Sequence, residues 1–421
     1  MFSCGSLFGQ QWQFRGLGNE LIRTLVVDQH DPNLLYAGTG SNFSEGTNGR
    51  IFKSTDGGMN WDTVFCCIDI IKLVMHPDSS SVIYAAIGGA NLNVGGVIKT
   101  TDAGINWFRA DSGIFLAPFV SVDAIEIDWS NPQTLYAGTV SVDWPTGIYK
   151  TANSGNSWLK LPDTTHYSDG PVAVIAIDPK NSNTIYMGAG SNPAVLKSTD
   201  GGESWKLTGL VTSGYGINEI KLLNSQTIYA AVDTTLMRSM DGGDSWIQIG
   251  PNIGFCAVSG INPLDITDIY FASCQGIWKT SDGGNSWHQF NSGLTDMSAY
   301  TLVRSNSKLY VGTNHGVFGT DITASIGDDI KLVPSEVTLY QNYPDPFNPV
   351  THFQFTIHNL QFVSLKVFDV LGNEVATLVN GAKPPGSYEA KWDASDMASG
   401  VYLYRLQAGR FSQTKKMLLL R

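Results

Sequence analysis

Short apolar runs separated by Gly, Pro, Asn and Asp fill most of the chain. Residues 25–64 are typical, because the runs LVVD, LLYAGT, RIFKS and NWDTV follow one another with turn residues between them. Short runs rich in β-branched and aromatic residues and bounded by turn residues are typical of β-strands. We therefore predict four antiparallel strands in this stretch, which we call strands a to d, and an all-β fold for the chain.

The four-strand unit recurs, and its recurrences share a short motif between strands c and d. Six segments carry the pattern S/T-x-D-x-G-x-x-W, with Asn in the Asp position of one copy: 54–61, 100–107, 151–158, 198–205, 239–246 and 280–287. A four-stranded unit repeated at this spacing indicates the blades of a β-propeller.

Each residue type in the motif has a local structural role. The Asp side chain can accept hydrogen bonds from the backbone N–H groups of a tight loop, Gly permits a positive φ, and the Trp ring can pack against the sheet. We therefore interpret these positions as structural and not as catalytic: Asp56, Asp102, Asn153, Asp200, Asp241, Asp282, Trp61, Trp107, Trp158, Trp205, Trp246 and Trp287. We expect the basic residue before each motif to be a solvated side chain of strand c: Lys53, Lys99, Lys150, Lys197, Arg238 and Lys279.

A seventh unit is incomplete. Residues 300–321 provide strands a to c, but Ile322 occupies the Asp position and no Trp follows. The segment 11–18, QWQFRGLG, resembles the strand that follows the motif in other units. We predict that it supplies the missing strand d, so that seven blades close into a ring with no exposed edge over residues 10–322.

The motif resembles the Asp-box, or bacterial neuraminidase repeat. This resemblance implies a β-propeller and brings three functional precedents with it. Sialidases and xyloglucanases are glycoside hydrolases that share these boxes, whereas photosystem II assembly factors share a similar single propeller and bind a protein. Because Asp-boxes are structural, the resemblance predicts the fold without deciding between these functions.

The last part of the chain has a different composition. After a linker at 323–334, residues 335–421 contain QNYPDPFNP, VSLKVFDVLGNEVATLVNG, KWDASDMASGVYLYRLQAG and TKKMLLLR. Their alternating short strands predict a small antiparallel, immunoglobulin-like sandwich. Together they resemble the type A sorting domain of the type IX secretion system. That resemblance implies recognition by the secretion machinery and a secreted or outer-surface location, with release or anchoring left open.

The composition agrees with an exported protein that binds neither nucleic acid nor lipid. The net charge is −11, Lys and Arg form no cluster before the last few residues, and no apolar run reaches the length of a membrane span. We expect no cofactor, no metal and a monomer. Residues 1–9 are either the remnant of a signal peptide or a disordered N-terminus.

Two cysteines are placed to form a disulfide. Cys256 and Cys274 lie symmetrically about Asp265, which marks the turn between strands a and b of the sixth unit. They should therefore face each other, and we predict a bond between them, the alternative being two buried thiols. We expect Cys66 and Cys67 to be free or packed.

The strand order predicts two different faces of the ring. The a–b and c–d turns share one face, here called the box face, and the longer b–c and d–a loops form the other, the loop face. Function is expected on the loop face, because varied loops carry most binding sites. Candidate ligand-binding residues are Arg23, Asn218, Lys221 and Tyr300 in the channel and Trp144, His166 and Tyr167 in the loops.

Three channel carboxylates, Asp69, Asp123 and Glu126, are the candidates for catalysis. Glycoside cleavage needs two placed carboxylates, and a sialidase also needs three convergent arginines. Only six arginines precede residue 330: Arg15, Arg23, Arg50, Arg109, Arg238 and Arg304. We therefore favour a non-catalytic module that binds a glycan or a protein, and keep a sialidase-like or xyloglucanase-like hydrolase as the alternative.

Overall fold

The computed structural model divides into two compact units, Met1–Ala324 and Ser325–Arg421. It describes residues 11–41, 48–88, 95–117, 119–141, 146–162, 171–189, 194–212, 216–254, 256–305, 308–322, 337–357, 361–383, 386–409 and 411–420. The segments interpreted as a signal-peptide remnant, 1–9, and as a linker, 323–334, lie outside these residues.

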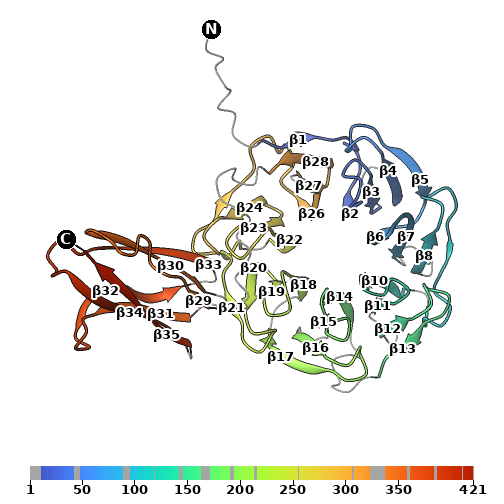
Figure 1. Cartoon of the computed structure of the whole chain (residues 1–421). Helices are drawn as coiled ribbons and strands as arrows, with labels where there is room; N and C mark the ends of the chain where they lie inside the picture. Colours follow the sequence, from blue (N-terminus) through green and yellow to red (C-terminus); the bar gives the residue numbers. More distant parts are fainter. Residues whose placement is uncertain are drawn as a thin grey trace, which may run out of the picture. The chain divides into compact units, whose positions relative to one another are not determined.

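The first unit is a seven-bladed β-propeller, and the predicted fold class is confirmed (Figure 1). Its first six blades are each made of four consecutive strands. Blade one contains β2 (Ile22–Val27), β3 (Leu35–Thr39), β4 (Arg50–Ser54) and β5 (Asp62–Cys66). Blade two contains β6 (Ile70–His76), β7 (Ser79–Ile87), β8 (Gly96–Thr100) and β9 (Phe108–Arg109). Blade three contains β10 (Ser121–Ile127), β11 (Leu135–Val140), β12 (Gly147–Thr151) and β13 (Leu159–Lys160). Blade four contains β14 (Val172–Ile177), β15 (Ile185–Ala189), β16 (Ala194–Ser198) and β17 (Lys206–Val211).

Blades five and six repeat this arrangement, whereas blade seven differs from the others in its connectivity. Blade five contains β18 (Ile217–Leu222), β19 (Ile228–Val232), β20 (Thr235–Ser239) and β21 (Ile247–Gln248). Blade six contains β22 (Val258–Pro263), β23 (Ile269–Ser273), β24 (Gly276–Thr280) and β25 (His288–Gln289). Blade seven joins β26 (Ala299–Ser305), β27 (Lys308–Thr313) and β28 (Gly316–Asp321) to β1 (Gln13–Phe14) from the start of the chain.

Trp12 takes the place of a box tryptophan in blade seven. Its indole N–H donates to the Phe290 carbonyl of blade six at 2.7 Å, as Trp158 donates to Ala110 of the blade before it. Because β1 pairs with β28 through Gln13 and Gly319, the N-terminal segment completes the ring and leaves β28 without a free edge.

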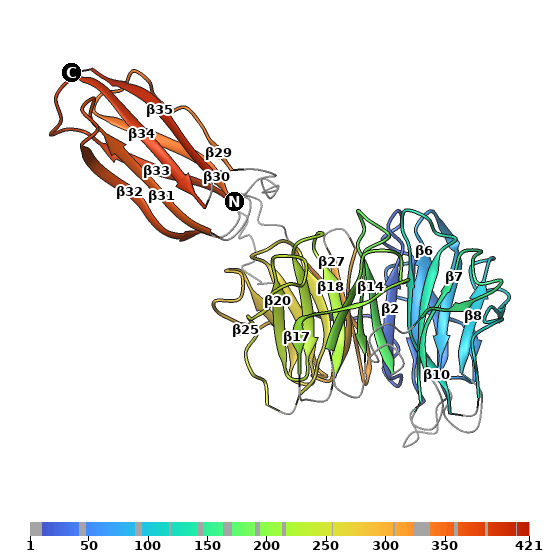
Figure 2. The same cartoon turned by 90° about the horizontal axis from the view of Figure 1, so that it is seen from below.

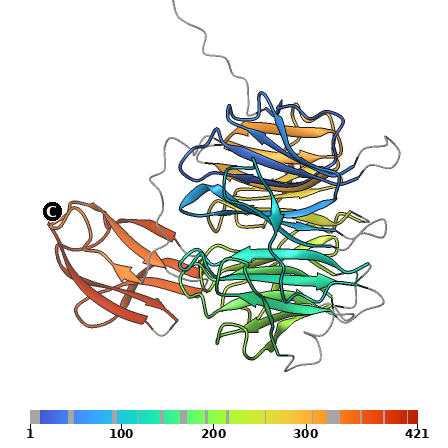
Figure 3. The same cartoon turned by 90° about the vertical axis from the view of Figure 1, so that its right-hand side faces the viewer.

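Neighbouring blades pack closely through small residues on the second strand of each blade. A Cβ added at Gly312 would lie 2.5 Å from Cγ2 of Ile22, which belongs to blade one. Gly38 stands in the same relation to Ile70 of blade two. Glycine is therefore required at these positions by the approach of the next blade. Figure 3 shows the blades side by side, seen from the edge of the ring.

The box loops are closed by the hydrogen bonds of their Asp side chains. In blade one, Asp56 accepts from the backbone N–H groups of Met59 and Asn60, at 2.9 Å each. Gly57 has a φ of 74° and donates to the Asn33 carbonyl in the a–b turn. The two turns therefore lie together on the box face.

The basic residues before the boxes are not simply solvated, which corrects the expectation from sequence. Lys53, Lys99, Lys150, Lys197 and Arg238 are half-buried, and each donates to a carbonyl in the box loop of the next blade. Their role is to join neighbouring blades, which a reading of one isolated strand does not reveal.

The cysteine pair of blade six is joined. Cys256 and Cys274 form a disulfide with a Cα–Cα distance of 5.3 Å, and Cys66 and Cys67 are free and exposed.

The second unit is an antiparallel sandwich (Figure 2). One sheet contains β29 (Thr338–Leu339), β30 (Val350–Ile357) and β33 (Gly386–Asp393). The other contains, in spatial order, β32 (Glu374–Lys383), β31 (Gln361–Phe368), β34 (Gly400–Ala408) and β35 (Phe411–Leu419). Phe353 and Tyr404 meet in the core between the sheets, with ring centroids 4.7 Å apart.

Candidate functional site

The innermost strand of every blade carries an irregularity that shapes the channel. Pairing between strands a and b skips one residue in all seven blades: Arg23, Ile71, Asp123, Ala173, Asn218, Ser259 and Tyr300. All seven line one hollow toward the loop face. A β-bulge re-aims the side chain of its extra residue, so this repeated bulge creates the first ring of channel residues.

Four of the residues selected from sequence belong to this ring, namely Arg23, Asp123, Asn218 and Tyr300. Burial raises the pKa of Asp123, although a hydrogen bond from Ser121 and the charge of Arg23 act in the opposite direction. The Tyr300 hydroxyl donates to Asn314 at 3.0 Å. The ring therefore offers a carboxyl, a guanidinium, an amide and a phenol at one opening.

Asp69 does not take the expected place in this ring. The observed register gives its position to Ile71, and Asp69 lies before the strand begins. The Asp69 carboxylate accepts hydrogen bonds from the backbone N–H of Ser41, at 2.6 Å, and from the Ser41 hydroxyl. It thus ties blade two to a loop of blade one, and the place expected for Asp69 from sequence was two residues out of register.

Deeper in the channel, four charged side chains come together: Lys72, Glu126, Glu219 and Lys221. Glu126 and Lys221 were expected there from sequence, whereas Lys72 and Glu219 were missed. Lys72 and Glu219 pair with Ala86 and Ala231 and so occupy the same level, one residue after the bulge. A charged residue at this repeat position is the signal that could have found them.

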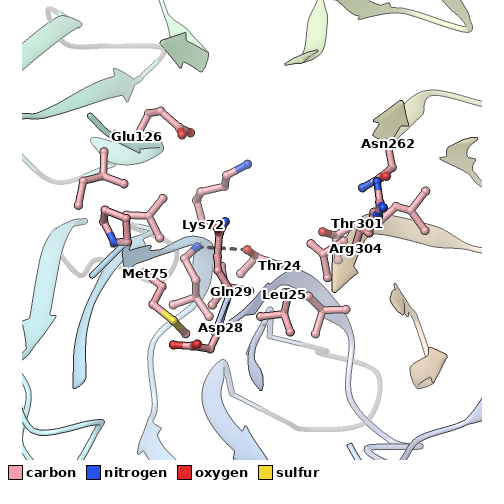
Figure 4. A pocket seen from close by; sticks show the side chains of 18 of the residues that line it. Thr24, Leu25, Asp28, Gln29, Lys72, Met75, Glu126, Asn262, Thr301 and Arg304 are labelled. Carbon is pink, nitrogen blue, oxygen red and sulfur yellow. Dashed lines mark hydrogen bonds between the residues drawn. The ribbon is translucent and has the colours of Figure 1, made fainter. Parts of the chain in front are cut away.

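Burial raises the pKa of both glutamates, and the positive charges of Lys72 and Lys221 oppose this rise. Glu219 also accepts a hydrogen bond from the backbone N–H of Ile261 at 2.7 Å. Figure 4 shows Lys72 and Glu126 extending from neighbouring blades into the open centre. The interior of the channel therefore holds both hydrogen-bond donors and acceptors.

The loop candidates Trp144, His166 and Tyr167 lie outside the residues that the structure describes. The arginines do not converge: Arg23 and Arg304 line different hollows, and Arg50 pairs with Glu20 at 2.8 Å. Arg109 pairs with Asp111 at 2.5 Å. Arg15 and Arg238 bond within the blade framework.

Two further observations concern the described residues only. They contain no group of three or more His, Cys, Asp or Glu side chains arranged to hold a metal ion. None of their elements is a helix with the length and hydropathy needed to cross a bilayer.

The chain therefore consists of two units, a propeller with a polar channel and a small sandwich. Residues 341–420 of the chain match the family model described as the secretion system C-terminal sorting domain. This domain directs export by the type IX secretion system to the cell surface or the extracellular space.

The chain is similar in sequence to xyloglucanases. A xyloglucanase from Paenibacillus sp is 25% identical over 207 residues, which is 46% of this chain and 17% of that enzyme. The chain thus spans less than a fifth of that relative's length.

Solved structures share the fold at low sequence identity. The Niastella koreensis GH74 enzyme has a TM-score of 0.55 and 15% identity, with 96% of this chain and 74% of that chain covered. PorZ from Porphyromonas gingivalis, a surface component of the type IX secretion system, has a TM-score of 0.52 and 17% identity, with 92% and 58% covered.

Proposed function

We propose that the propeller is a non-catalytic binding module, delivered to the cell surface or its surroundings by the sorting domain. The observation that carries this proposal is the mutual compensation of charge in the channel. Glu126 and Glu219 are each influenced by the same two ammonium groups, those of Lys72 and Lys221. Side chains balanced in this way are suited to hydrogen bonding with a neutral polar ligand.

The absence of an arginine cluster among the described residues argues in the same direction. A sialidase holds its substrate carboxylate with several convergent arginines, because bidentate guanidinium contacts recognise that group best. In this channel Arg23 and Arg304 open toward different hollows. A glycan or a surface protein without such a carboxylate is the better ligand.

One observation favours a second candidate, a glycoside hydrolase. Burial raises the pKa of Asp123, Glu126 and Glu219, and a raised pKa is the property of a carboxyl group that donates a proton in glycoside cleavage. The similarity to xyloglucanases is in line with this alternative.

Incubating the full chain with a glycan array and a panel of chromogenic glycosides distinguishes the two functions. We expect binding without turnover. Turnover that is abolished in Asp123→Asn and retained in Lys206→Met, a change at an exposed position of β17 outside the channel, would establish the hydrolase instead.

A further inference from the structure

Trp129 is a tryptophan that the blade repeat does not explain. The box tryptophans are largely covered: Trp158 and Trp205 are 2% and 3% exposed, whereas Trp129 is 47% exposed. Trp129 follows strand a of blade three, and the register places Gln29, Pro77 and Pro179 at the corresponding positions of blades one, two and four. The fold therefore does not require an aromatic side chain there.

The turn that carries Trp129 is held firmly. The preceding residue, Asp128, is 4% exposed and accepts hydrogen bonds from the backbone N–H and the hydroxyl of Ser130, at 2.9 and 2.8 Å. The Ser130 hydroxyl also contacts that of Ser182 in the next blade at 2.5 Å. An exposed ring on a fixed turn loses little backbone freedom when a ligand covers it.

Trp129 stands where the channel opens on the box face. It lines two adjoining hollows of about 250 and 240 Å³, and both also include Lys72, Glu126 and Lys221. Asn262 and Arg304 line the larger one. An apolar ring and a set of hydrogen-bonding groups thus border the same space.

The charges around this opening are nearly balanced. The two hollows together contain three cationic side chains, Lys72, Lys221 and Arg304, and four acidic ones, Asp28, Asp178, Glu126 and Glu219. A polyanion would meet as much repulsion as attraction there. A neutral ligand with many hydroxyl groups, which both donate and accept, matches the lining better.

We propose that the opening on the box face binds a neutral carbohydrate chain, with one sugar ring stacked on Trp129 and its hydroxyl groups bonded to Lys72, Glu126 and Lys221. A pyranose has an apolar C–H face that suits an indole and an equatorial set of hydroxyls that suits the charged groups. This proposal rests on the proposed binding function and assigns it to the face opposite the variable loops.

The test is calorimetric titration of the full chain with four probes: cellopentaose, mannopentaose, xyloglucan heptasaccharide and, as the acidic comparison, trigalacturonate. We expect a neutral probe to bind, and we expect Trp129→Ala to weaken that binding by on the order of tenfold or more. A tenfold change in Kd corresponds to about 1.4 kcal/mol. Trp129→Phe should recover part of it. Because Trp129 is exposed, the melting temperature of both variants should match that of the wild type.

Tyr300→Ala is the comparison variant for the other opening, because Tyr300 is 40% exposed and lines the hollow toward the loop face. Loss of binding in Tyr300→Ala with retention in Trp129→Ala would overturn the location and leave the binding function standing. Binding of trigalacturonate above that of the neutral probes would overturn the ligand class. A wild-type chain that binds none of the four would contradict both this inference and a carbohydrate-binding function.

Discussion

Tyr136 and Lys150, which face each other on adjacent strands of blade three, donate to one carbonyl oxygen, that of Gly201 in the box loop of blade four, at 3.1 Å each. The Lys150 ammonium also lies 5.3 Å from the centroid of the Tyr136 ring. Tyr36 with Lys53, and Tyr186 with Lys197, repeat the arrangement on Ala103 and Gly242. Each of these box loops therefore accepts hydrogen bonds from the preceding blade and also closes the turn of its own blade.

Removing one donor of this pair should destabilise the ring. We expect Tyr136→Phe or Lys150→Met to lower the free energy of unfolding by about 1 kcal/mol, the usual contribution of one such hydrogen bond. Urea denaturation followed by tryptophan fluorescence measures the loss. Lys206→Met, an exposed lysine of strand d in blade four, is the control and should change stability by less than about 0.5 kcal/mol. Equal effects at Lys150 and Lys206 would contradict the role in joining blades.

Closure of the ring by the N-terminal segment gives a second prediction. Trp12 is 2% exposed and packs edge to face on Phe290, with ring centroids 5.9 Å apart. Replacing a buried aromatic side chain by Ala costs about 3–5 kcal/mol, so Trp12→Ala should lower the melting temperature sharply. Phe14→Ala, at a 54% exposed position of the same N-terminal segment, should have a much smaller effect. Deletion of residues 10–18 without a change in melting temperature would refute closure by this segment.

The boxes should make stability depend on pH in acid. Hydrogen bonds from the loop lower the pKa of Asp56, Asp200 and Asp282 from 3.8 to about 2. Because the folded state favours the ionised form, this contribution is present above the ordinary pKa and is lost as pH falls from 4 toward 2.

The triple variant Asp56→Asn, Asp200→Asn, Asp282→Asn lacks these titrating groups. Asn153 already occupies the same position in blade three and accepts from the Ser157 N–H at 3.0 Å, so the loop tolerates the amide. We expect the wild type to have the higher melting temperature at pH 5 and the difference to shrink toward pH 2. A difference that is constant across this range would rule out the ionised boxes as its source.

The disulfide of blade six should be detectable chemically. Chain denatured without reductant, from residue 10 onward, should titrate two thiols, those of Cys66 and Cys67. Reduction should raise the number to four and lower stability by about 3 kcal/mol, the effect expected for a closed loop of this size. Four thiols before reduction would exclude the bond.

Sequence reasoning reached much of the fold because the informative signals are local. The boxes, the seven units and the sorting motifs are each read within a few tens of residues, and the segment around Trp12 was recognised by its likeness to other strands d. The candidate site was reached only in part. Asp69 was placed two residues out of register and Lys72 and Glu219 were missed, because pairing with the neighbouring strand decides which side chains enter the channel.

The sequence alone determined the repeat, the Asp-closed loops and the C-terminal sorting domain. Turn residues, strand patterning and short motifs act through neighbours along the chain. Only the tertiary structure decided which side chains meet. It turned Lys150 from an apparently solvated residue into a link between blades, and it brought Trp129 and Lys221 to the lining of one hollow, although these residues are far apart in the sequence. The physical reason is that a closed ring brings one strand from every blade to a common axis, and the register of those strands selects the side chains that line it.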